Sequence, residues 1–213
     1  MREGFRLALP LALAVGVFGV SFGVLAEEAG LGPVAPVVMS ATTFAGSAQF
    51  AAISVLAAGG GALSASVAAI LLNTRYGAIG FSVAPGLKGR LPARFVRSQL
   101  VVDESWAVAN RGDGQFDPQL LLGAGLALYV AWVAGTVAGV AGGSLVAEPE
   151  ELGLDAAFPA LFLALLWPMV RERRPLAAAI LGAVVALALT PLVRPGVPII
   201  AAACACAIGW WRR

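Results

Sequence analysis

The sequence predicts an all-α integral membrane protein with six to seven transmembrane helices. Of its 213 residues, 60% are hydrophobic and only 12% are charged, and the mean hydropathy is +0.89. Soluble domains carry about 25% charged residues. A helix needs roughly 20 apolar residues to cross the ~30 Å hydrocarbon core of a bilayer, and this chain contains several runs of that length. The chain therefore uses lipid as part of its solvent.

The apolar segments fill nearly the whole chain. They run over residues 7–26, 34–58, 62–84, 119–146, 156–170, 176–193 and 196–211. Because they leave no room for a soluble domain, residues 1–213 are predicted to form a single transmembrane domain. The first segment is longer than the 7–15 apolar residues of a signal peptide, so it is predicted to remain as a membrane helix.

Basic residues indicate which loops face the cytoplasm. The positive-inside rule places residues 88–97, residues 171–174 and the C-terminus there. If Arg2 and Arg6 are also inside, an even number of crossings must precede Lys88, yet three apolar segments do. Either the N-terminus faces out, which gives seven crossings, or one segment in the N-terminal third is broken or re-entrant, as at transporter substrate sites. Both alternatives remain open at this point.

The composition argues against an enzyme and against a cofactor. The chain has no histidine, which excludes histidine metal sites, histidine-based triads and histidine proton relays. The acidic residues are scattered, and the single lysine, Lys88, lies in a loop. Cys204 and Cys206 point to different sides of a helix at their i, i+2 spacing, so they are predicted to be small apolar residues.

The second apolar segment is unusually polar. At helical spacing its polar residues form two adjoining stripes, one of Ser40, Thr43 and Ser47 and one of Thr42, Gly46 and Gln49. Polar groups need partners in lipid because an unsatisfied one is costly. One interpretation is a polar cavity wall in which Gly46 allows a break or the close approach of a ligand. The other is helix–helix packing, for which membrane proteins use the same residue types.

The third apolar segment carries an arginine near its middle, in the run Asn73-Thr74-Arg75-Tyr76. An arginine at mid-bilayer depth costs about 2.5–3.5 kcal/mol even on the lenient insertion scale. Arg75 is therefore predicted to face a carboxylate, a wet cavity or a bound anion. The alternative is that the segment is shifted and Arg75 extends to the interface.

Residues 98–110 are too few to span the bilayer. Gln99, Asp103, Trp106 and Asn110 would stack on one helical face, with Glu104 about 100° away. One carboxylate is then a candidate partner for Arg75, and a desolvated one is a candidate to titrate. The alternative is an amphipathic helix on the cytoplasmic face with its charges in water.

Small-xxx-small spacings predict close helix–helix packing without naming a partner. They occur at Gly19 and Gly23, and at Gly135, Gly139 and Gly143. Tyr129 and Trp132 nearby either line a cavity or pack. Asp155 is predicted to lie at a helix N-terminus, where it complements the macrodipole.

Five blocks occur in one order along the chain. They are Gly16-Val17-Phe18-Gly19 with Phe22-Gly23, Phe44–Phe50, Asn73-x-Arg75-Tyr76, Asp103–Ala107, and Leu154-Asp155 with Phe158–Phe162. Together they resemble the AzlC family, the large subunit of branched-chain amino acid exporters. Thr74 stands where the family more often has leucine, and the side chains of Gly77–Gly80 are smaller than is usual in the family.

The resemblance implies a secondary transporter subunit in the bacterial inner membrane. It implies export of leucine, isoleucine and valine, with methionine as a further candidate, driven by proton antiport together with a small AzlD-type membrane subunit. Three alternatives stay open: a structural or assembly subunit without transport of its own, an exporter of another small apolar amino acid or metabolite, and a channel.

An amino acid zwitterion needs a cation or helix N-terminus for its carboxylate, an acceptor for its ammonium group and an apolar slot for its side chain. The expected substrate-binding residues are Thr43, Phe44, Gly46, Ser47, Gln49, Asn73, Arg75 and Tyr76. Asp103 and Glu104 are the expected proton-coupling residues. No metal site is expected.

Overall fold

The computed structural model describes residues 1–112, 115–142, 163, 166–167, 169–171, 173–193 and 197–203. The chain divides into two compact units: unit 1 comprises Met1–Gly46 and Asn73–Pro149, and unit 2 comprises Ser47–Leu72 and Glu150–Arg213. Most described residues are helical, which confirms the all-α prediction. That the two units act as one transporter domain stays a prediction.

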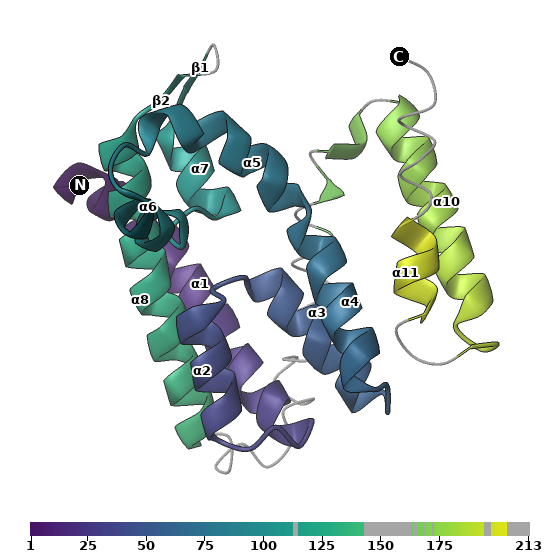
Figure 1. The fold of residues 1–213 in the computed structure, drawn as a ribbon. Helices are drawn as coiled ribbons and strands as arrows, with labels where there is room; N and C mark the ends of the chain where they lie inside the picture. The colour runs from purple at the N-terminus through teal and green to yellow at the C-terminus, as the bar shows by residue number, and fades with distance from the viewer. Residues whose placement is uncertain are drawn as a thin grey trace. The chain divides into compact units, whose positions relative to one another are not determined.

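Unit 1 contains most of the described helices and one short β-hairpin. Its elements are α1 (Arg2–Glu28), α2 (Val34–Thr42), α5 (Arg75–Val83), the 3-10 helix η1 (Ala84–Gly86), α6 (Leu91–Ser98), α7 (Asp103–Ala109), β1 (Asn110–Gly112), β2 (Gln115–Phe116) and α8 (Pro118–Gly142). The strands pair antiparallel, with Asn110 opposite Phe116 and Gly112 opposite Gln115. In Figure 1, α5, α6, α7 and the hairpin gather at the end of unit 1 where the N-terminus lies.

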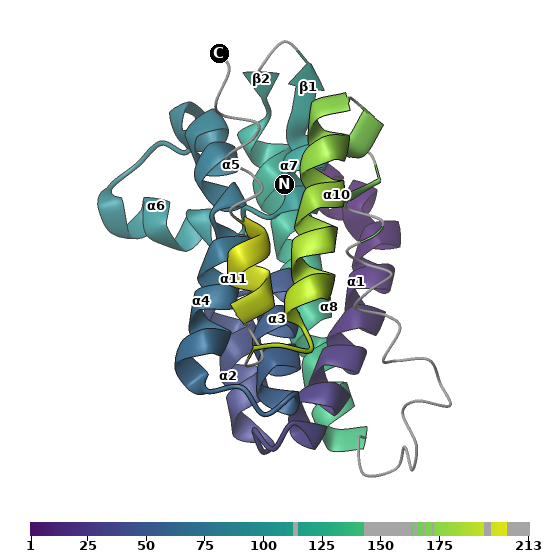
Figure 2. The same ribbon diagram turned by 90° about the vertical axis from the view of Figure 1, so that its right-hand side faces the viewer.

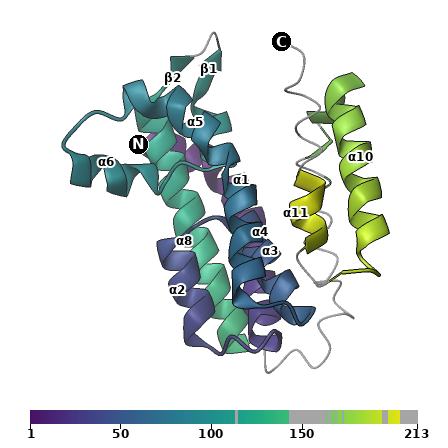
Figure 3. The same cartoon turned by 45° about the vertical axis from the view of Figure 1, so that its right-hand side comes forward.

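Unit 2 contains shorter helices. They are α3 (Gly46–Ala57), α4 (Ala62–Asn73), the 3-10 helix η4 (Met169–Arg171), α10 (Arg173–Leu189) and α11 (Val197–Ala203). Helices α10 and α11 lie side by side (Figures 2 and 3). Residues 47–53 of α3 form an uninterrupted buried run.

Within the described residues, three helical stretches are long and apolar enough to cross a membrane. They are Arg2–Glu28, Ala62–Gly86 and Pro118–Gly142, and the shorter apolar helices are Gly46–Ala57 and Pro175–Leu189. Much of the predicted segments 156–170 and 196–211 lies outside the described residues, as do Gly143, Asp155, Cys204 and Cys206.

Helices α1 and α8 pack in parallel with their backbones in contact (Figures 1 and 3). Glycine makes this possible, because a Cβ at Gly19 would lie 2.6 Å from the Trp132 carbonyl oxygen and one at Gly23 would lie 2.5 Å from that of Thr136. Gly135 and Gly139 face the backbone of α1 in the same way. The small-residue spacings of the two segments are therefore partners of each other.

The beginning of α8 is fixed by an aspartate cap. Asp117 Oδ1 accepts hydrogen bonds from the backbone N–H groups of Gln119 (2.8 Å) and Leu120 (3.1 Å), which the first turn leaves without helical partners. Its Oδ2 pairs with Arg111 at 2.9 Å. Met1 lies beside Gln119, with 3.3 Å between its amino nitrogen and Gln119 Oε1, so α1 and α8 begin at the same end of unit 1.

The 98–110 stretch is not one helix, so the predicted face of Gln99, Asp103, Trp106 and Asn110 is wrong. Helix α6 ends at Ser98, α7 begins at Asp103, and Asn110 lies in β1. The Ser105 hydroxyl stabilises the intervening turn: it accepts from the Val102 N–H at 2.9 Å and is 2.8 Å from the Leu100 carbonyl oxygen. A side-chain hydroxyl thus replaces the helical bonds of this turn.

Candidate functional site

The second apolar segment is broken. Helix α2 ends at Thr42 and α3 begins at Gly46, and Phe44 between them is the one non-glycine residue in the described part of the chain with a positive φ, at 41°. This region of backbone space disfavours bulky side chains. A broken segment, one of the two alternatives left open for this third of the chain, is what the structure shows. The polar stripes drawn on one continuous helix are wrong, because the helix is interrupted between Thr42 and Gly46.

Helix α8 holds the break in place. The Phe44 ring packs edge-on against Tyr129 with 5.1 Å between centroids, and the Tyr129 hydroxyl donates to the Ala41 carbonyl oxygen at 2.8 Å. A Cβ at Gly46 would lie 2.9 Å from the Trp132 ring. Tyr129 and Trp132 therefore pack against the break, and both lie near the middle of α8.

Helix α2 runs antiparallel to α8 and reaches only to its middle. The Ser40 and Thr136 hydroxyl oxygens are 2.8 Å apart near the C-terminal half of α8, whereas Ala41 and Phe44 contact Tyr129 further toward its N-terminus. Ser40 and Thr136 are both fully buried. The hydroxyl groups satisfy each other, as expected of helix–helix packing in lipid.

The predicted polar residues around the break differ in burial. Ser47 and Gln49 are buried and belong to unit 2, whereas Thr43 is exposed. The amide of Gln49 is 1% exposed. A buried amide requires hydrogen-bond partners, so the surroundings of Gln49 must supply them.

Arg75 and Asp103 form an ion pair in unit 1. Arg75 Nη2 lies 2.8 Å from Asp103 Oδ2, and the two side chains are 31% and 25% exposed. Arg75 is the fourteenth residue of the 25-residue stretch Ala62–Gly86, so it lies near the middle of a possible membrane crossing. A carboxylate partner was one of the environments predicted for this arginine.

Two neighbours on the same chain segment surround the ion pair. The Arg75 guanidinium lies over the Tyr76 ring at 5.1 Å from its centroid, and Arg75 Nη2 is 3.5 Å from the Tyr76 hydroxyl oxygen. Asn73 Oδ1 is buried and accepts no hydrogen bond from any described residue. The site thus combines a cation, a carboxylate and a phenol, and Asn73 lies two residues before Arg75 in the chain.

Glu104 adds a second carboxyl group beside Asp103. Burial raises the pKa of Glu104, against a backbone hydrogen bond that lowers it, and the Asp103 charge raises it further. Burial also raises the pKa of Asp103, although the Arg75 charge lowers it. Desolvation thus favours the protonated form of both groups, which suits them to exchange protons.

A hydrogen bond between α7 and α5 positions the two acids. Trp106 Nε1 donates to Ser82 Oγ at 2.9 Å, and the Trp106 ring packs against Phe116 at 5.4 Å. Beneath this contact, Val83, Leu87, Ala109, Leu120 and Leu121 form a small apolar core. Sequence reasoning missed Ser82, because nothing local to it indicates a partner 24 residues away.

The structure therefore brings the predicted residues together in two groups within unit 1. Arg75, Tyr76, Asp103 and Glu104 form the polar cluster, with Asn73 adjoining it along the chain. Phe44 and Gly46 belong to the break against α8. The roles predicted for Thr43, Ser47 and Gln49 stay predictions. No group of potential metal-binding side chains occurs among the residues that were placed.

Comparison with known proteins identifies the relatives of this chain. The family described as AzlC protein matches residues 10–146. An uncharacterized membrane protein of Archaeoglobus fulgidus is 36% identical over 207 residues, covering 96% of this chain and 91% of that protein. Inner membrane protein YgaZ of Escherichia coli is 28% identical over 202 residues, covering 88% and 81%.

A third relative has a name that states a function. The branched-chain amino acid transport protein AzlC of Bacillus subtilis is 27% identical over 169 residues, covering 76% of this chain and 65% of that protein. No solved structure matches. The matched region includes the break, the polar cluster and all of α8. The chain is an integral membrane protein that belongs to the AzlC family.

Proposed function

We propose that this chain is the large subunit of a secondary transporter that exports branched-chain amino acids by proton antiport across the bacterial inner membrane. Leucine, isoleucine and valine are the expected substrates, with methionine as a further candidate, and a small AzlD-type protein is the expected partner. The name of the Bacillus subtilis relative supports the substrate class. The observation that carries the mechanism is the Arg75–Asp103 ion pair.

An amino acid carries the same two charges as this ion pair. In the proposed bound state the substrate lies between the two side chains, its carboxylate on Arg75 and its ammonium group on Asp103. The partial exposure of both side chains leaves room for such an exchange. A guanidinium is suited to a carboxylate because its N–H groups form a planar fork. Asn73 Oδ1, buried without a described donor, is proposed as a second acceptor for the ammonium group.

Antiport follows if a proton and the substrate compete for one carboxylate. When Asp103 is protonated it loses its attraction for the ammonium group, so the substrate is released. When Asp103 loses the proton, it can hold the next substrate. Its raised pKa makes protonation accessible, and Glu104 beside it is proposed to relay the proton. A symporter would instead bind substrate more tightly at low pH.

The proposal includes a re-entrant segment at residues 34–57. Helices α1 and α8 are parallel, so an odd number of crossings must separate them. Between them, Ala62–Gly86 is the one described stretch long enough to cross. Helices α2 and α3, of 9 and 12 residues, are each too short. They are therefore proposed to enter and leave from the same side, with the break at Phe44 at mid-depth.

Cysteine accessibility tests this topology. In a chain with Cys204 and Cys206 replaced by serine, Glu28→Cys and Gly61→Cys should react with a membrane-impermeant maleimide applied from the outside, and Arg90→Cys should not. Labelling of positions 28 and 61 from opposite sides would overturn the re-entrant segment.

Flux measurements in proteoliposomes test the function. The chain and its small partner subunit, reconstituted together, should move labelled leucine against its gradient when a pH gradient is imposed, and the flux should saturate. Asp103→Asn should abolish this pH-driven flux, and Glu104→Gln should reduce it by at least about tenfold. Glu28→Gln is the control, because it removes an exposed carboxylate at the far end of α1.

Several outcomes would contradict the proposal. Full coupling in both Asp103→Asn and Glu104→Gln would exclude the assigned carboxylates. Absence of flux for every amino acid tested, with both subunits present, would favour an assembly subunit. Leucine binding that strengthens as the pH falls would favour symport. Flux that never saturates would indicate a channel.

A further inference from the structure

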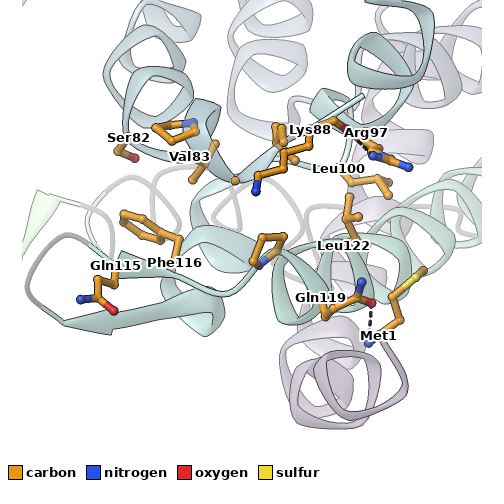
Figure 4. Close-up of a pocket in the computed structure, with 14 residues that line it drawn as sticks. Met1, Ser82, Val83, Lys88, Arg97, Leu100, Gln115, Phe116, Gln119 and Leu122 are labelled. Atoms are coloured by element: carbon orange, nitrogen blue, oxygen red, sulfur yellow. Dashed lines mark hydrogen bonds between the residues drawn. The ribbon is translucent and has the colours of Figure 1, made fainter. Parts of the chain in front are cut away.

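A pocket with a basic side lies at the end of unit 1 where α1 and α8 begin. Its volume is about 840 Å³. Lys88 and Arg97 supply its basic side, and its apolar wall includes Val83, Leu87, Leu100, Phe116 and Leu122. In Figure 4 the Lys88 ammonium group points into the space between the 82–88 turn and the start of α8, and the Arg97 guanidinium lies apart from it, near Leu100.

Backbone contacts hold the basic side of the pocket together. Arg97 Nη1 donates to the Lys88 carbonyl oxygen, which ties α6 to the 82–88 turn. This contact uses one of the five N–H donors of a guanidinium. The others are available to an anion, as is the Lys88 ammonium group, for which no contact is recorded among the described residues.

Helix α6 forms one rim of the pocket and is strongly amphipathic. Arg90, Arg94 and Arg97 follow one another at i, i+4 and i+7, so they share one face. The opposite side carries Leu91, Phe95 and Val96, which are 79%, 67% and 65% exposed. A short helix with a basic face and an uncovered apolar face is suited to the plane where headgroups meet acyl chains. Figure 2 shows α6 extending sideways from unit 1.

The charge distribution assigns this end of unit 1 to the cytoplasmic leaflet. Arg2 and Arg6 begin α1 beside the pocket, and no lysine or arginine occurs from residue 7 to residue 74. The other end of α1 carries Glu27 and Glu28. By the positive-inside rule, the basic end faces the cytoplasm, where the leaflet is rich in anionic lipid.

We propose that this pocket binds an anionic phospholipid of the cytoplasmic leaflet. The phosphodiester lies between Lys88 and Arg97, and an acyl chain runs along the apolar wall toward Leu122. Charge complementarity selects the anionic headgroup, since basic pockets between membrane helices bind such lipids. The apolar wall favours a lipid over a soluble phosphate, which has nothing to place there. This site is independent of the transport proposal.

Lipid binding to the purified full-length chain tests the site. The delipidated protein in detergent is titrated with dioleoyl phosphatidylglycerol or dioleoyl phosphatidylcholine, and bound lipid is counted by native mass spectrometry. Phosphatidylglycerol should bind at least about fivefold more tightly. Lys88→Gln and Arg97→Gln should each weaken it by about fivefold, as expected for the loss of about 1 kcal/mol per basic residue.

Arg94→Gln is the matched control, because it removes the same charge from the same helix outside the pocket. Its affinity for phosphatidylglycerol should stay near that of the parent. Lys88→Gln removes no recorded hydrogen bond, so a folding defect is not expected to mask the result. Equal binding of the two lipids, or unchanged binding in both pocket variants, would overturn the proposal. Displacement of the lipid by equimolar glycerol phosphate would assign the site to a soluble phosphate instead.

Discussion

The α1–α8 pair and the α5–α7 corner are assembled in opposite ways within the same unit. Helices α1 and α8 meet through glycine, with no side chain between the backbones at Gly19 and Gly23. The α5–α7 corner is held by side chains, through the Arg75–Asp103 ion pair and the Trp106–Ser82 hydrogen bond. The first contact is buried and holds the two backbones at a fixed distance. The second is partly exposed, and its side chains can exchange partners or protons.

Under the proposed function, the difference separates the part of the unit that maintains the fold from the part that exchanges substrate and protons. A backbone-to-backbone contact has no alternative arrangement of similar energy, because interiors are close-packed. An ion pair whose two side chains are each partly exposed can exchange partners with a ligand that offers the same two charges. We therefore expect substitutions in the first region to affect folding and those in the second to affect function.

The largest effect is expected from closing the glycine contact. Gly19→Leu places a side chain where even a Cβ would lie 2.6 Å from the Trp132 carbonyl oxygen, so α1 and α8 must separate. We expect loss of folded protein, measured as recovery in the monodisperse peak of a size-exclusion column. Gly61→Leu is the control, because a Cβ at Gly61 meets no atom within 4 Å. Normal recovery of Gly19→Leu would contradict the packing.

A smaller, pH-dependent effect is expected from Glu104→Gln. Folding raises the pKa of Glu104 above its ordinary value of 4.5, so the folded protein binds this proton more tightly than the unfolded chain. The resulting stabilisation is complete below the unfolded pKa and is lost as the pH rises through the folded pKa. The variant lacks this titration.

The melting temperature of Glu104→Gln relative to the parent should therefore increase between pH 4 and pH 8, by a few degrees. The measurement is a thermal melt in detergent across that range. A relative melting temperature that falls as the pH rises would reverse the assigned sign.

The smallest effect is expected at the cap of α8. Asp117→Ala removes the acceptor for two backbone N–H groups and should destabilise the protein by about 0.5–2 kcal/mol, with transport retained. Asp117→Asn should recover part of this loss, because an amide oxygen also caps. The melting temperatures of the two variants provide the comparison. An effect as large as that of Gly19→Leu would show that more than a cap depends on this residue.

The distance along the chain between contacting residues explains which features the sequence could predict and which it could not. The apolar segments and the break near Gly46 are local properties of composition and spacing, and the described residues contain helices over the first four predicted segments and a break before Gly46. The pairing of Gly19 with α8 depends on residues more than 100 positions away, so spacing predicted close packing without a partner. The 98–110 stretch was predicted wrongly because the Ser105 hydroxyl favours a turn where periodicity alone favours a helix.

The candidate site also contains residues that the sequence could predict and residues that it could not. The energetic cost of an arginine in the middle of an apolar segment predicts a carboxylate, a wet cavity or a bound anion beside it, and Asp103 is the carboxylate that the structure places there. The contribution of Ser82 depends on Trp106 being brought to it by α7, which no local pattern reveals. Functional residues with a high cost of burial are visible in a sequence, whereas those that only orient them are not.

The glycine contact between α1 and α8 also sets a problem for biosynthesis. Gly19 is made well before Gly135, and at a translation rate of roughly 5–20 residues per second the delay is roughly 6–23 s. During this time α1 lies in the bilayer without α8 packed against its glycine face. We expect the insertion machinery to cover the glycine face of α1 until α8 has entered the bilayer.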